Sequence, residues 1–351
     1  MNASLRKEWT RMTVPDREPI LDVKGLHKQF PVYGPFGRLS GVRARVQAVT
    51  DVSFELREGE TYGLVGESGS GKSTTARTLL GLTPATKGEV RYGKRNLTKL
   101  SREEWRAFRK EIQMVFQDPY SSLNPRKRIG TILEEPLEIH GLGDAAERKQ
   151  QVFRILEIVG LRPEHYFRYP HEFSGGQRQR LGLARALIIS PRIIVCDEPV
   201  SALDVSIQSQ ILNLLKDLQR DMKLTLLFIT HDLSVVRHIS DRIGVMYLGR
   251  LVEEAPTDGL FSEPLHPYTQ ALFSAVPDFT RGKLERRKPL QGEIPSPLNP
   301  PAGCVFHTRC PWAVDRCKRE IPQMREVRPQ HRVACHLVEE QADKNEPSLA
   351  P

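Results

Sequence analysis

Gly66-Glu-Ser-Gly-Ser-Gly-Lys-Ser-Thr74 is the stretch that decides the fold of this chain. Its two outer glycines are separated by four residues and are followed by Lys and Ser, which is the phosphate-loop pattern. Glycines allow the backbone to fold tightly around phosphates with its N–H groups pointing inward. We therefore predict a nucleotide site made by Gly66, Glu67, Ser68, Gly69, Ser70, Gly71, Lys72, Ser73 and Thr74. The motif assigns Lys72 to the β- and γ-phosphates and the Ser73 hydroxyl to Mg²⁺.

The surrounding sequence predicts an α/β fold with a mostly parallel sheet. An extended run over 60–65 leads into the loop, and a helix over 75–80 follows it. The apolar runs at 193–196 and 224–229 are typical of central parallel strands. Strands are also expected at 20–30 and 46–56, with a turn-rich loop at 31–37 between them. Strands that alternate with helices around a phosphate loop indicate a parallel sheet.

Two acidic residues follow the apolar run Ile193-Ile-Val-Cys196. Ligands of open α/β sheets bind at the carboxyl edge of the strands, where this run would deliver Asp197 and Glu198. We expect Asp197 to hold Mg²⁺ through its water shell and Glu198 to act as the general base toward water. Upstream, Ser174-Gly-Gly-Gln177 precedes a predicted helix over 177–189, whose N-terminus would face an anion.

The ordered set of motifs resembles the ATP-binding subunits of ATP-binding cassette (ABC) transporters. The resemblance covers about residues 20–255 and implies that the nucleotide is ATP. It implies a catalytic Glu198 and a switch histidine, His231, in Ile229-Thr-His-Asp-Leu233. Gln117, in Val115-Phe-Gln-Asp-Pro119, would sense Mg²⁺ and water. Phe30 is the expected aromatic partner of adenine, with Tyr33 and Phe36 as rivals.

The same resemblance implies a head-to-tail pair of ATPase subunits. Each ATP would lie between one phosphate loop and the signature helix of the partner, which removes the need for an arginine finger. The residues expected to reach the partner's ATP are Ser174, Gly175, Gly176, Gln177 and Asp204.

The C-terminal third resembles the extension of oligopeptide, dipeptide and nickel importers. The resemblance rests on four segments. They are Leu265-His-Pro-Tyr with the residues that follow it to Pro277, the segments at 117–125 and 292–297, and Gly303-Cys-Val-Phe-His-Thr-Arg-Cys-Pro-Trp312. The resemblance implies peptide import, with nickel or another solute as the alternative. It also implies a second, related ATPase subunit, two permease subunits contacted by the helical region, and an extracytoplasmic solute-binding protein.

The expected organisation is a leader at 1–18, an ABC ATPase domain at 19–258, a C-terminal domain at 259–337 and a tail at 338–351. The ATPase domain would combine a parallel core, an antiparallel β subdomain and a helical subdomain at about 100–175. No apolar run reaches the ~20 residues that span a bilayer, and the start of the chain lacks the apolar core of a secretory signal. We therefore expect an intracellular protein, and the resemblance to the importers implies a peripheral position on the cytoplasmic face of the membrane.

Four of the five cysteines fall at the end of the chain, at Cys304, Cys310, Cys317 and Cys335. Disulfides are uncommon inside cells, so a metal site is the leading hypothesis and free thiols are the alternative. Four thiolates suit Zn²⁺ or an iron–sulfur cluster. The resemblance to peptide importers favours a [4Fe–4S] cluster, with His307 and His336 as substitute ligands.

A net charge of +9 admits another class of function, because basic proteins often bind nucleic acid. A soluble ABC ATPase of DNA repair or translation is one such alternative, and a zinc-type nucleic-acid module at 290–336 is another. The single cassette and the absence of a long heptad run disfavour the first. Only Trp312 and Arg309 support the second. We therefore expect no nucleic-acid partner.

Overall fold

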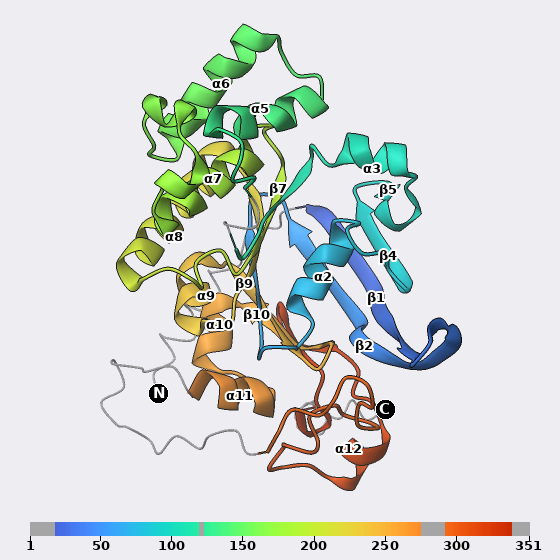
Figure 1. Ribbon diagram of the computed structural model, residues 1–351. Helices are drawn as coiled ribbons and strands as arrows, with labels where there is room; N and C mark the ends of the chain where they lie inside the picture. Colours follow the sequence, from blue (N-terminus) through green and yellow to red (C-terminus); the bar gives the residue numbers. More distant parts are fainter. Residues whose placement is uncertain (1–17, 119–122, 275–291, 339–351) are drawn as a thin grey trace, which may run out of the picture.

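The computed structural model describes residues 18–118, 123–274 and 292–338. Within these ranges the strands form two sheets, one of eight strands and one of four (Figure 1). The expected leader and tail lie almost wholly outside the described residues, as do residues 119–122 of the segment at 117–125. Among the described helices, none combines the length and the apolar character needed to cross a bilayer.

The larger sheet has the order β11-β12-β10-β9-β3-β8-β7-β6. Its strands are β3 (Thr61–Val65), β6 (Ile112–Val115), β7 (Ile193–Asp197), β8 (Thr225–Ile229), β9 (Arg242–Tyr247), β10 (Arg250–Pro256), β11 (Arg325–Arg328) and β12 (His331–Val333). The run from β9 through β3, β8 and β7 to β6 is parallel, and the remaining pairs are antiparallel. β3, β7 and β8 are buried along their whole length, which explains their continuous apolar sequences.

The smaller sheet is antiparallel, with the order β2-β1-β4-β5. Its strands are β1 (Pro19–Gly34), β2 (Gly37–Arg57), β4 (Lys87–Tyr92) and β5 (Arg95–Asn96). The loop expected at 31–37 is instead mostly strand, because β1 and β2 stay paired out to Gly34 and Gly37. Pro31 is tolerated there, since proline can occupy strands near a sheet edge or an irregular register.

Helix α2 (Lys72–Leu79) lies between the two sheets, α3 (Arg102–Phe108) lies beside the smaller sheet, and α7 (Gly175–Leu187), α8 (Val205–Met222) and α9 (Leu233–Ile239) lie on the other side of the larger sheet (Figure 1). One apolar core joins the two sheets and α2. A second core joins the helical region to β6, β7 and β8. The helices are α3 (Arg102–Phe108), α5 (Ile129–Ile139), α6 (Ala145–Ile158), α7 (Gly175–Leu187), α8 (Val205–Met222), α9 (Leu233–Ile239), α10 (Thr257–Ser262), α11 (Pro267–Ser274) and α12 (Asp315–Arg319). This architecture confirms the predicted α/β ABC fold, with its parallel core, antiparallel sheet and helical region.

Two helical elements show how sequence and packing combine. Pro136 lies inside α5. Asp144 caps the start of α6, where its carboxylate accepts hydrogen bonds from the N–H groups of Ala146 and Glu147. α3 packs on the antiparallel sheet, with the ring of Phe108 edge-on to Tyr92 at 4.9 Å.

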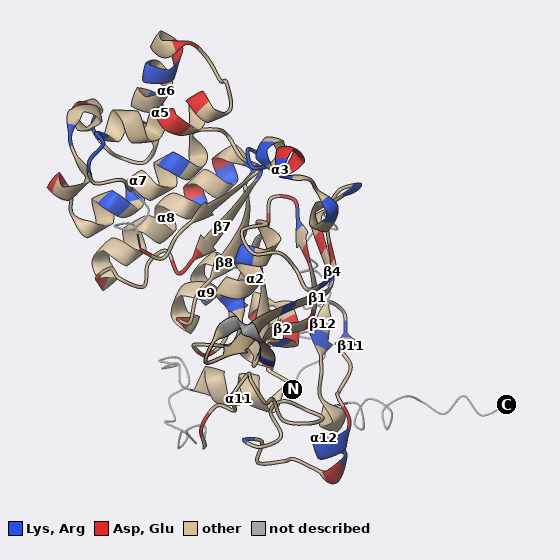
Figure 2. Ribbon diagram, turned by 45° about the vertical axis from the view of Figure 1, so that its right-hand side comes forward, with Lys and Arg blue, Asp and Glu red and all other residues tan. Residues whose placement is uncertain are grey.

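The C-terminal extension joins the ATPase core through a third apolar cluster. This cluster contains Tyr247 of β9, Tyr268 of α11 and Phe306, whose rings lie 4.7 to 5.4 Å apart. β12 pairs with β10, so the end of the extension also continues the larger sheet. The extension and α6 lie at opposite ends of the molecule (Figures 1 and 2).

Candidate active site

The phosphate loop connects β3 to α2 and depends on two glycines. A Cβ on Gly66 would lie 2.2 Å from the carbonyl oxygen of Met246. Gly71 has φ 103°, and a Cβ there would lie 2.3 Å from the carbonyl oxygen of Ala48. These backbone contacts cannot move aside cheaply, so neither position accepts a side chain.

Lys72 is buried at the centre of the loop. Its Nζ donates to the carbonyl oxygens of Gly66 at 2.8 Å and Glu67 at 2.9 Å, and to Ser70 Oγ at 3.3 Å. Burial lowers the pKa of Lys72, whereas Glu198 and Asp197 raise it. The ammonium group is thus held inside the loop, where an anionic phosphate would relieve the cost of its burial.

Ser73 and Asp197 meet at the carboxyl end of β7. Ser73 Oγ donates to Asp197 Oδ1 at 2.8 Å, and Asp197 is 3% exposed. Burial raises the pKa of Asp197, while the hydrogen bond from Ser73 lowers it. A hydroxyl and a carboxylate side by side provide the oxygen ligands that Mg²⁺ prefers, so the donor set fits the predicted ion.

Glu198 joins two other predicted residues. Its Oε1 lies 3.0 Å from His231 Nδ1, and its Oε2 accepts a hydrogen bond from Gln117 Nε2 at 3.0 Å. The three residues follow β6, β7 and β8, which are adjacent parallel strands, so the sheet brings them to one edge. Glu198 has φ 49°, and non-glycine residues in this region cluster at functional sites.

The signature residues form a separate part of the surface. Ser174 caps α7: its Oγ accepts from the N–H of Gln177, and its N–H donates to Gln177 Oε1 at 3.0 Å. A Cβ on Gly176 would lie 2.5 Å from Ile207, so this helix end packs closely on α8. Asp204 caps α8 by accepting from the N–H of Ile207 at 3.0 Å. Among the described residues, the side-chain hydrogen bonds of Ser174 and Gln177 join these two residues, those of Asp204 stay at the start of α8, and none of them reaches the loop at 66–74.

The register of β1 distinguishes the three aromatic candidates for adenine. Phe30 pairs with Val46, two residues from Ala48, whose carbonyl contacts the phosphate loop. Tyr33 pairs with Val42, and Phe36 lies at the turn of the hairpin, so both are farther along the strands. Phe30 is 39% exposed, and Lys28 Nζ lies 4.8 Å from its ring centroid. Register therefore favours Phe30.

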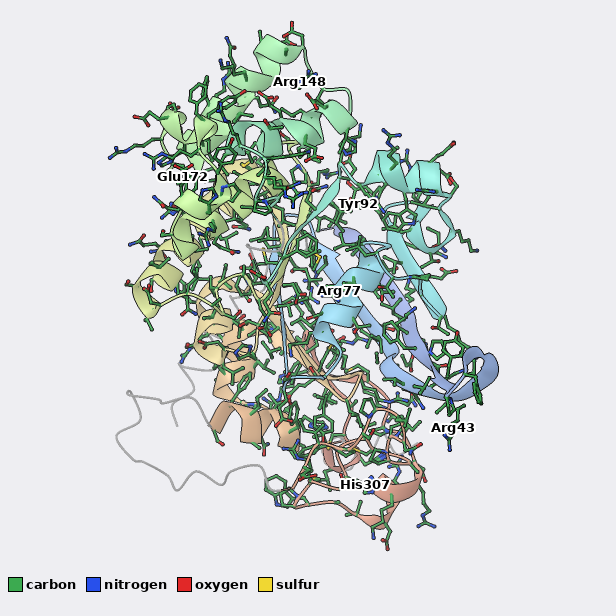
Figure 3. All side chains as sticks on the ribbon, viewed as in Figure 1. Arg43, Arg77, Tyr92, Arg148, Glu172 and His307 are labelled. Atoms are coloured by element: carbon green, nitrogen blue, oxygen red, sulfur yellow. The ribbon has the colours of Figure 1, made fainter. Side chains whose placement is uncertain are left out.

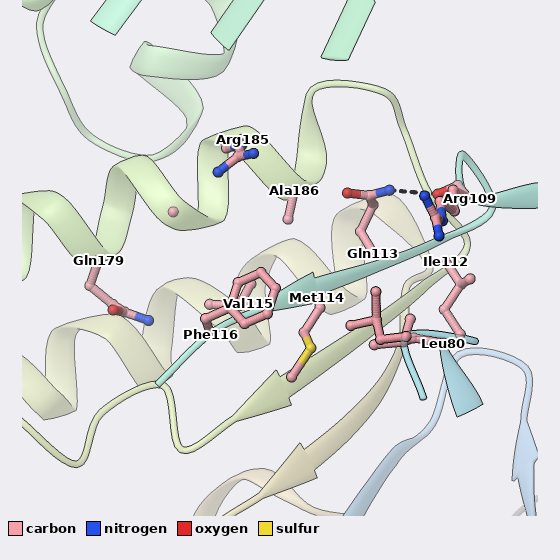
Figure 4. Close-up of a pocket in the computed structure, with 12 residues that line it drawn as sticks. Leu80, Arg109, Ile112, Gln113, Met114, Val115, Phe116, Gln179, Arg185 and Ala186 are labelled. Carbon is pink, nitrogen blue, oxygen red and sulfur yellow. Dashed lines mark hydrogen bonds between the residues drawn. The ribbon is translucent and has the colours of Figure 1, made fainter. Parts of the chain in front are cut away.

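A groove of about 180 Å³ lies between the β6 edge and α7 (Figure 4). Its floor is apolar, with Leu80, Met114 and Phe116 among its lining residues, and Arg109 and Arg185 lie at its margins. Phe116 directly precedes Gln117 in the chain. An occupant of the groove would thus be one residue from the cluster around Glu198.

The four C-terminal cysteines come together in space. The N–H of Cys304 donates to the carbonyl of Cys317 at 2.8 Å. Burial, together with the neighbouring thiols of Cys317, Cys335 and Cys310, raises the pKa of Cys304 to about 12. All are free thiols. Among the described residues, however, no group of three His, Cys, Asp or Glu side chains is arranged so that it could hold a metal ion.

The two histidines proposed as substitute ligands face backbone groups instead. His307 Nδ1 lies 2.8 Å from the carbonyl oxygen of Cys304, and His336 Nε2 lies 3.1 Å from that of Glu320. Figure 3 places His307 in the extension, well away from Arg77 on α2.

Three contacts near the loop were not predicted from sequence. Arg309 Nη1 donates to Glu67 Oε2 at 2.7 Å, and Nη2 donates to Oε1 at 3.2 Å. The N–H of Glu67 donates to the Tyr268 hydroxyl at 2.9 Å. The motif Leu265-His-Pro-Tyr includes Tyr268. No local pattern, however, indicates that Tyr268 contacts Glu67, a residue of the phosphate loop 201 positions earlier in the sequence.

The surface gives little support to a nucleic-acid module. Lys and Arg residues are spread over many elements and are interspersed with acids (Figure 2). The side chain of Arg309, one of the two residues that suggested such a module, is 5% exposed and paired with Glu67. Of the two, it is Trp312, 55% exposed, whose side chain lies at the surface.

Comparison with known proteins identifies two matching family models. The model described as ABC transporter matches residues 49–201. The model described as oligopeptide/dipeptide transporter, C-terminal region, matches residues 252–317.

Several curated relatives span nearly the whole chain. An oligopeptide transport ATP-binding protein, AppF of Bacillus subtilis, is 54% identical over 330 residues, which cover 93% of this chain and 99% of the relative. A di/tripeptide transport ATP-binding protein, DppF of Pseudomonas aeruginosa, is 48% identical over 92% of this chain and 99% of the relative.

Solved structures resemble the ATPase part. The dimeric post-hydrolysis structure of the ATP-binding cassette MJ0796, bound to ADP and Pi, has a TM-score of 0.60 and 30% identity. It covers 68% of this chain and 98% of the cassette. The cbiO1 protein of Clostridium perfringens shares the fold, with a TM-score of 0.60 over 70% of this chain and 92% of its own.

Proposed function

Since this chain belongs to the family of ABC transporter ATP-binding subunits of the oligopeptide/dipeptide type, we propose that it hydrolyses ATP to power peptide import. The observation that carries the proposal is the cluster of Glu198, Gln117 and His231 at one sheet edge. Ser73, which follows Lys72 in the phosphate loop, is hydrogen-bonded to Asp197 at that edge. A structural acidic pair would not need these partners from three adjacent strands.

Each side chain has a distinct role in the proposed reaction. Lys72 moves from the loop carbonyls to the β- and γ-phosphates as a point charge. Ser73 and Asp197 would hold Mg²⁺, and that ion would supply positive charge to the phosphates when bound. Glu198 accepts the proton of the attacking water, and His231 hydrogen-bonds the γ-phosphate and keeps that water in place. Gln117 is hydrogen-bonded to Glu198 and follows Phe116, which lines the groove, so a shift of Gln117 on phosphate binding would change the groove.

Completion of the site requires a second ATPase subunit. Ser174, Gly175, Gly176 and Gln177 open a helix whose N-terminal N–H groups suit an anion, yet they are not joined to their own phosphate loop. They would face the ATP of the partner, with Asp204 beside them. The dimeric form of the similar cassette MJ0796 supports this arrangement. Following the family, we propose a related rather than identical partner.

The groove between β6 and α7 is the proposed contact with a permease subunit. Its floor is apolar, it is open at the surface, and it lies beside Gln117, so a short permease helix seated there would sense ATP. Two permease subunits would hold this chain at the cytoplasmic face of the membrane. An extracytoplasmic solute-binding protein would deliver the peptide to them.

The four cysteines are proposed to hold a [4Fe–4S] cluster, with Zn²⁺ as the alternative. The supporting observation is that Cys304, Cys310 and Cys335 each lie close enough to another of the four thiols for that neighbour to raise their pKa, in addition to the effect of burial. In the bound state, thiolates bonded to iron would replace the buried neutral thiols, and these bonds would cross-link a Pro-rich segment. The present geometry of the described side chains does not form a ligand set, so binding would require the cysteines to change their positions.

The metal proposal is tested by an anaerobic absorption spectrum with iron, sulfide and zinc assays on the same sample. Iron and sulfide in equal amounts, with a broad visible band, would support the cluster. Stoichiometric zinc without colour would establish the zinc alternative. A metal-free protein with four reactive thiols would refute both.

The transport proposal is tested with the full chain reconstituted in proteoliposomes with its permeases and partner ATPase. We expect ATP hydrolysis and ATP-dependent uptake of a labelled tripeptide, with both lost in the Lys72→Ala protein. ATP hydrolysis without peptide uptake would support the assignment as an ATPase and refute the assignment of peptide as the transported solute. Absence of both from the wild-type assembly would refute the proposed function.

A further inference from the structure

The cysteine-rich extension reaches into the phosphate loop through one ion pair. Arg309 lies immediately before Cys310, and its guanidinium makes two hydrogen bonds to the carboxylate of Glu67. Its side chain is 5% exposed and that of Glu67 is 24% exposed. A two-bond guanidinium–carboxylate pair in a mostly buried place is geometrically specific and strong compared with a surface pair.

Glu67 is anchored from the extension at a second point. Its N–H donates to the hydroxyl of Tyr268 on α11, and Arg309 Nη1 also approaches the hydroxyl of Tyr247 at 3.4 Å. The carbonyl oxygen of Glu67 accepts a hydrogen bond from Lys72 Nζ at 2.9 Å. The path from Arg309 to the phosphate-binding ammonium group therefore passes through a single loop residue.

The charge of Glu67 gives this contact a consequence for nucleotide binding. A carboxylate in a phosphate loop repels the phosphates that the loop must bind, unless a cation neutralises it. Arg309 supplies that cation and also fixes the direction of the carboxylate. The turn that carries Arg309 is the one that carries the cysteines, because the N–H of Arg309 donates to Phe306 and that of His307 donates to Cys304.

We propose that Arg309 is a positioning residue of the ATP site, through which the cysteine-rich extension sets the conformation and charge of the phosphate loop. The inference rests on the proposed ATPase function and extends it, because it makes nucleotide affinity depend on the extension. By linkage, ATP must in turn stabilise the segment 304–317.

The first test is a double-mutant cycle on the full-length protein, with Arg309→Gln, Glu67→Gln and the double variant. We expect Arg309→Gln to raise the Kd for a fluorescent ATP analogue, and the KM, on the order of tenfold, while kcat changes less than about twofold. In the Glu67→Gln background the same substitution should change Kd by less than about twofold, because the carboxylate that it neutralises is gone. Arg309→Lys keeps the positive charge but cannot make the two parallel hydrogen bonds of a guanidinium group, so it should recover part of the affinity for ATP.

Arg328→Gln is the matched control. Arg328 makes a comparable two-bond ion pair with Glu263, and it also lies in the extension. We expect its Kd for ATP to equal that of the wild type. Tyr268→Phe is a second probe of the anchor that removes only the hydroxyl, so it serves if Arg309→Gln does not fold.

The second test is hydrogen exchange of residues 304–317 with and without ATP. ATP should slow exchange there in the wild type and the Arg328→Gln protein, but not in the Arg309→Gln protein. Equal Kd values for wild type and Arg309→Gln, or an equal effect in both Glu67 backgrounds, would overturn the inference. A wild-type chain that does not bind ATP would instead overturn the proposed function on which it rests.

Discussion

The substitution Glu198→Gln tests the chemical role of the acidic pair most directly. Glu198 touches His231 and Gln117 through its two carboxylate oxygens, each at 3.0 Å. Glutamine has nearly the same shape, and its amide oxygen can keep one of these contacts, so the site should keep its arrangement. What is lost is the ability to accept a proton from water at neutral pH.

The magnitude follows from the loss of a general base. Such a group contributes about 10²- to 10⁴-fold to a rate, which corresponds to roughly 3 to 5 kcal/mol in the activation free energy. Binding should change little, because Lys72, Ser73 and Asp197 are untouched and one negative charge near the phosphates is removed. We therefore expect kcat to fall by at least about a hundredfold with a Kd for ATP no weaker than that of the wild type.

The assay is phosphate release under single-turnover conditions, combined with gel filtration in ATP and Mg²⁺. The blocked variant should accumulate as an ATP-bound dimer with its partner subunit. Glu263→Gln is the control, since it removes an exposed carboxylate that pairs with Arg328. Turnover by Glu198→Gln within about tenfold of the wild-type rate would refute the assignment of the base.

Three further predictions address binding, stability and pH. Lys72→Ala should bind ATP far more weakly in an equilibrium titration while its thermal unfolding stays cooperative, and normal ATP affinity would refute the phosphate-loop assignment. Arg242→Met should lower the free energy of unfolding in urea by about 3 to 5 kcal/mol, because Arg242 bridges the buried carboxylates of Glu60 and Glu254. Its loss would leave Glu60 with the N–H of Arg57 and Glu254 with Arg332 as their remaining partners among the described residues, and a loss below about 1 kcal/mol would contradict this. Burial lowers the pKa of His266 to about 4, and its Nδ1 accepts the N–H of Tyr268 at 3.0 Å. Because the folded pKa lies below the unfolded value near 6.5, His266 costs no stability above pH 6.5 and destabilises the fold progressively as pH falls toward 4, by about 3 kcal/mol in all. His266→Asn, which keeps an acceptor but does not titrate, should flatten that part of the stability curve, and an unchanged curve would contradict the assignment.

The sequence by itself determined the fold class, because its signals are local. The phosphate loop needs glycines at fixed spacing, and buried parallel strands need unbroken apolar runs, so each can be recognised without knowing its neighbours. The same applies to the acidic pair, since the end of a buried strand is visible in the sequence. The expected loop at 31–37 shows the limit of local signals: proline and glycine there indicated a turn, but cross-strand pairing extended the hairpin through it.

Only the tertiary structure decided which distant residues share a site. The order of the strands brings Gln117, Glu198 and His231 to one edge, and strand order is a property of the whole sheet. Sequence analysis could place them together only through resemblance to a family. The contact of Arg309 with Glu67 spans 242 residues and has no local signature, because ion pairs depend on where side chains converge and not on spacing along the chain. The sequence thus set the elements and their chemistry, and packing of the extension against the core set the link between the cysteines and the phosphate loop.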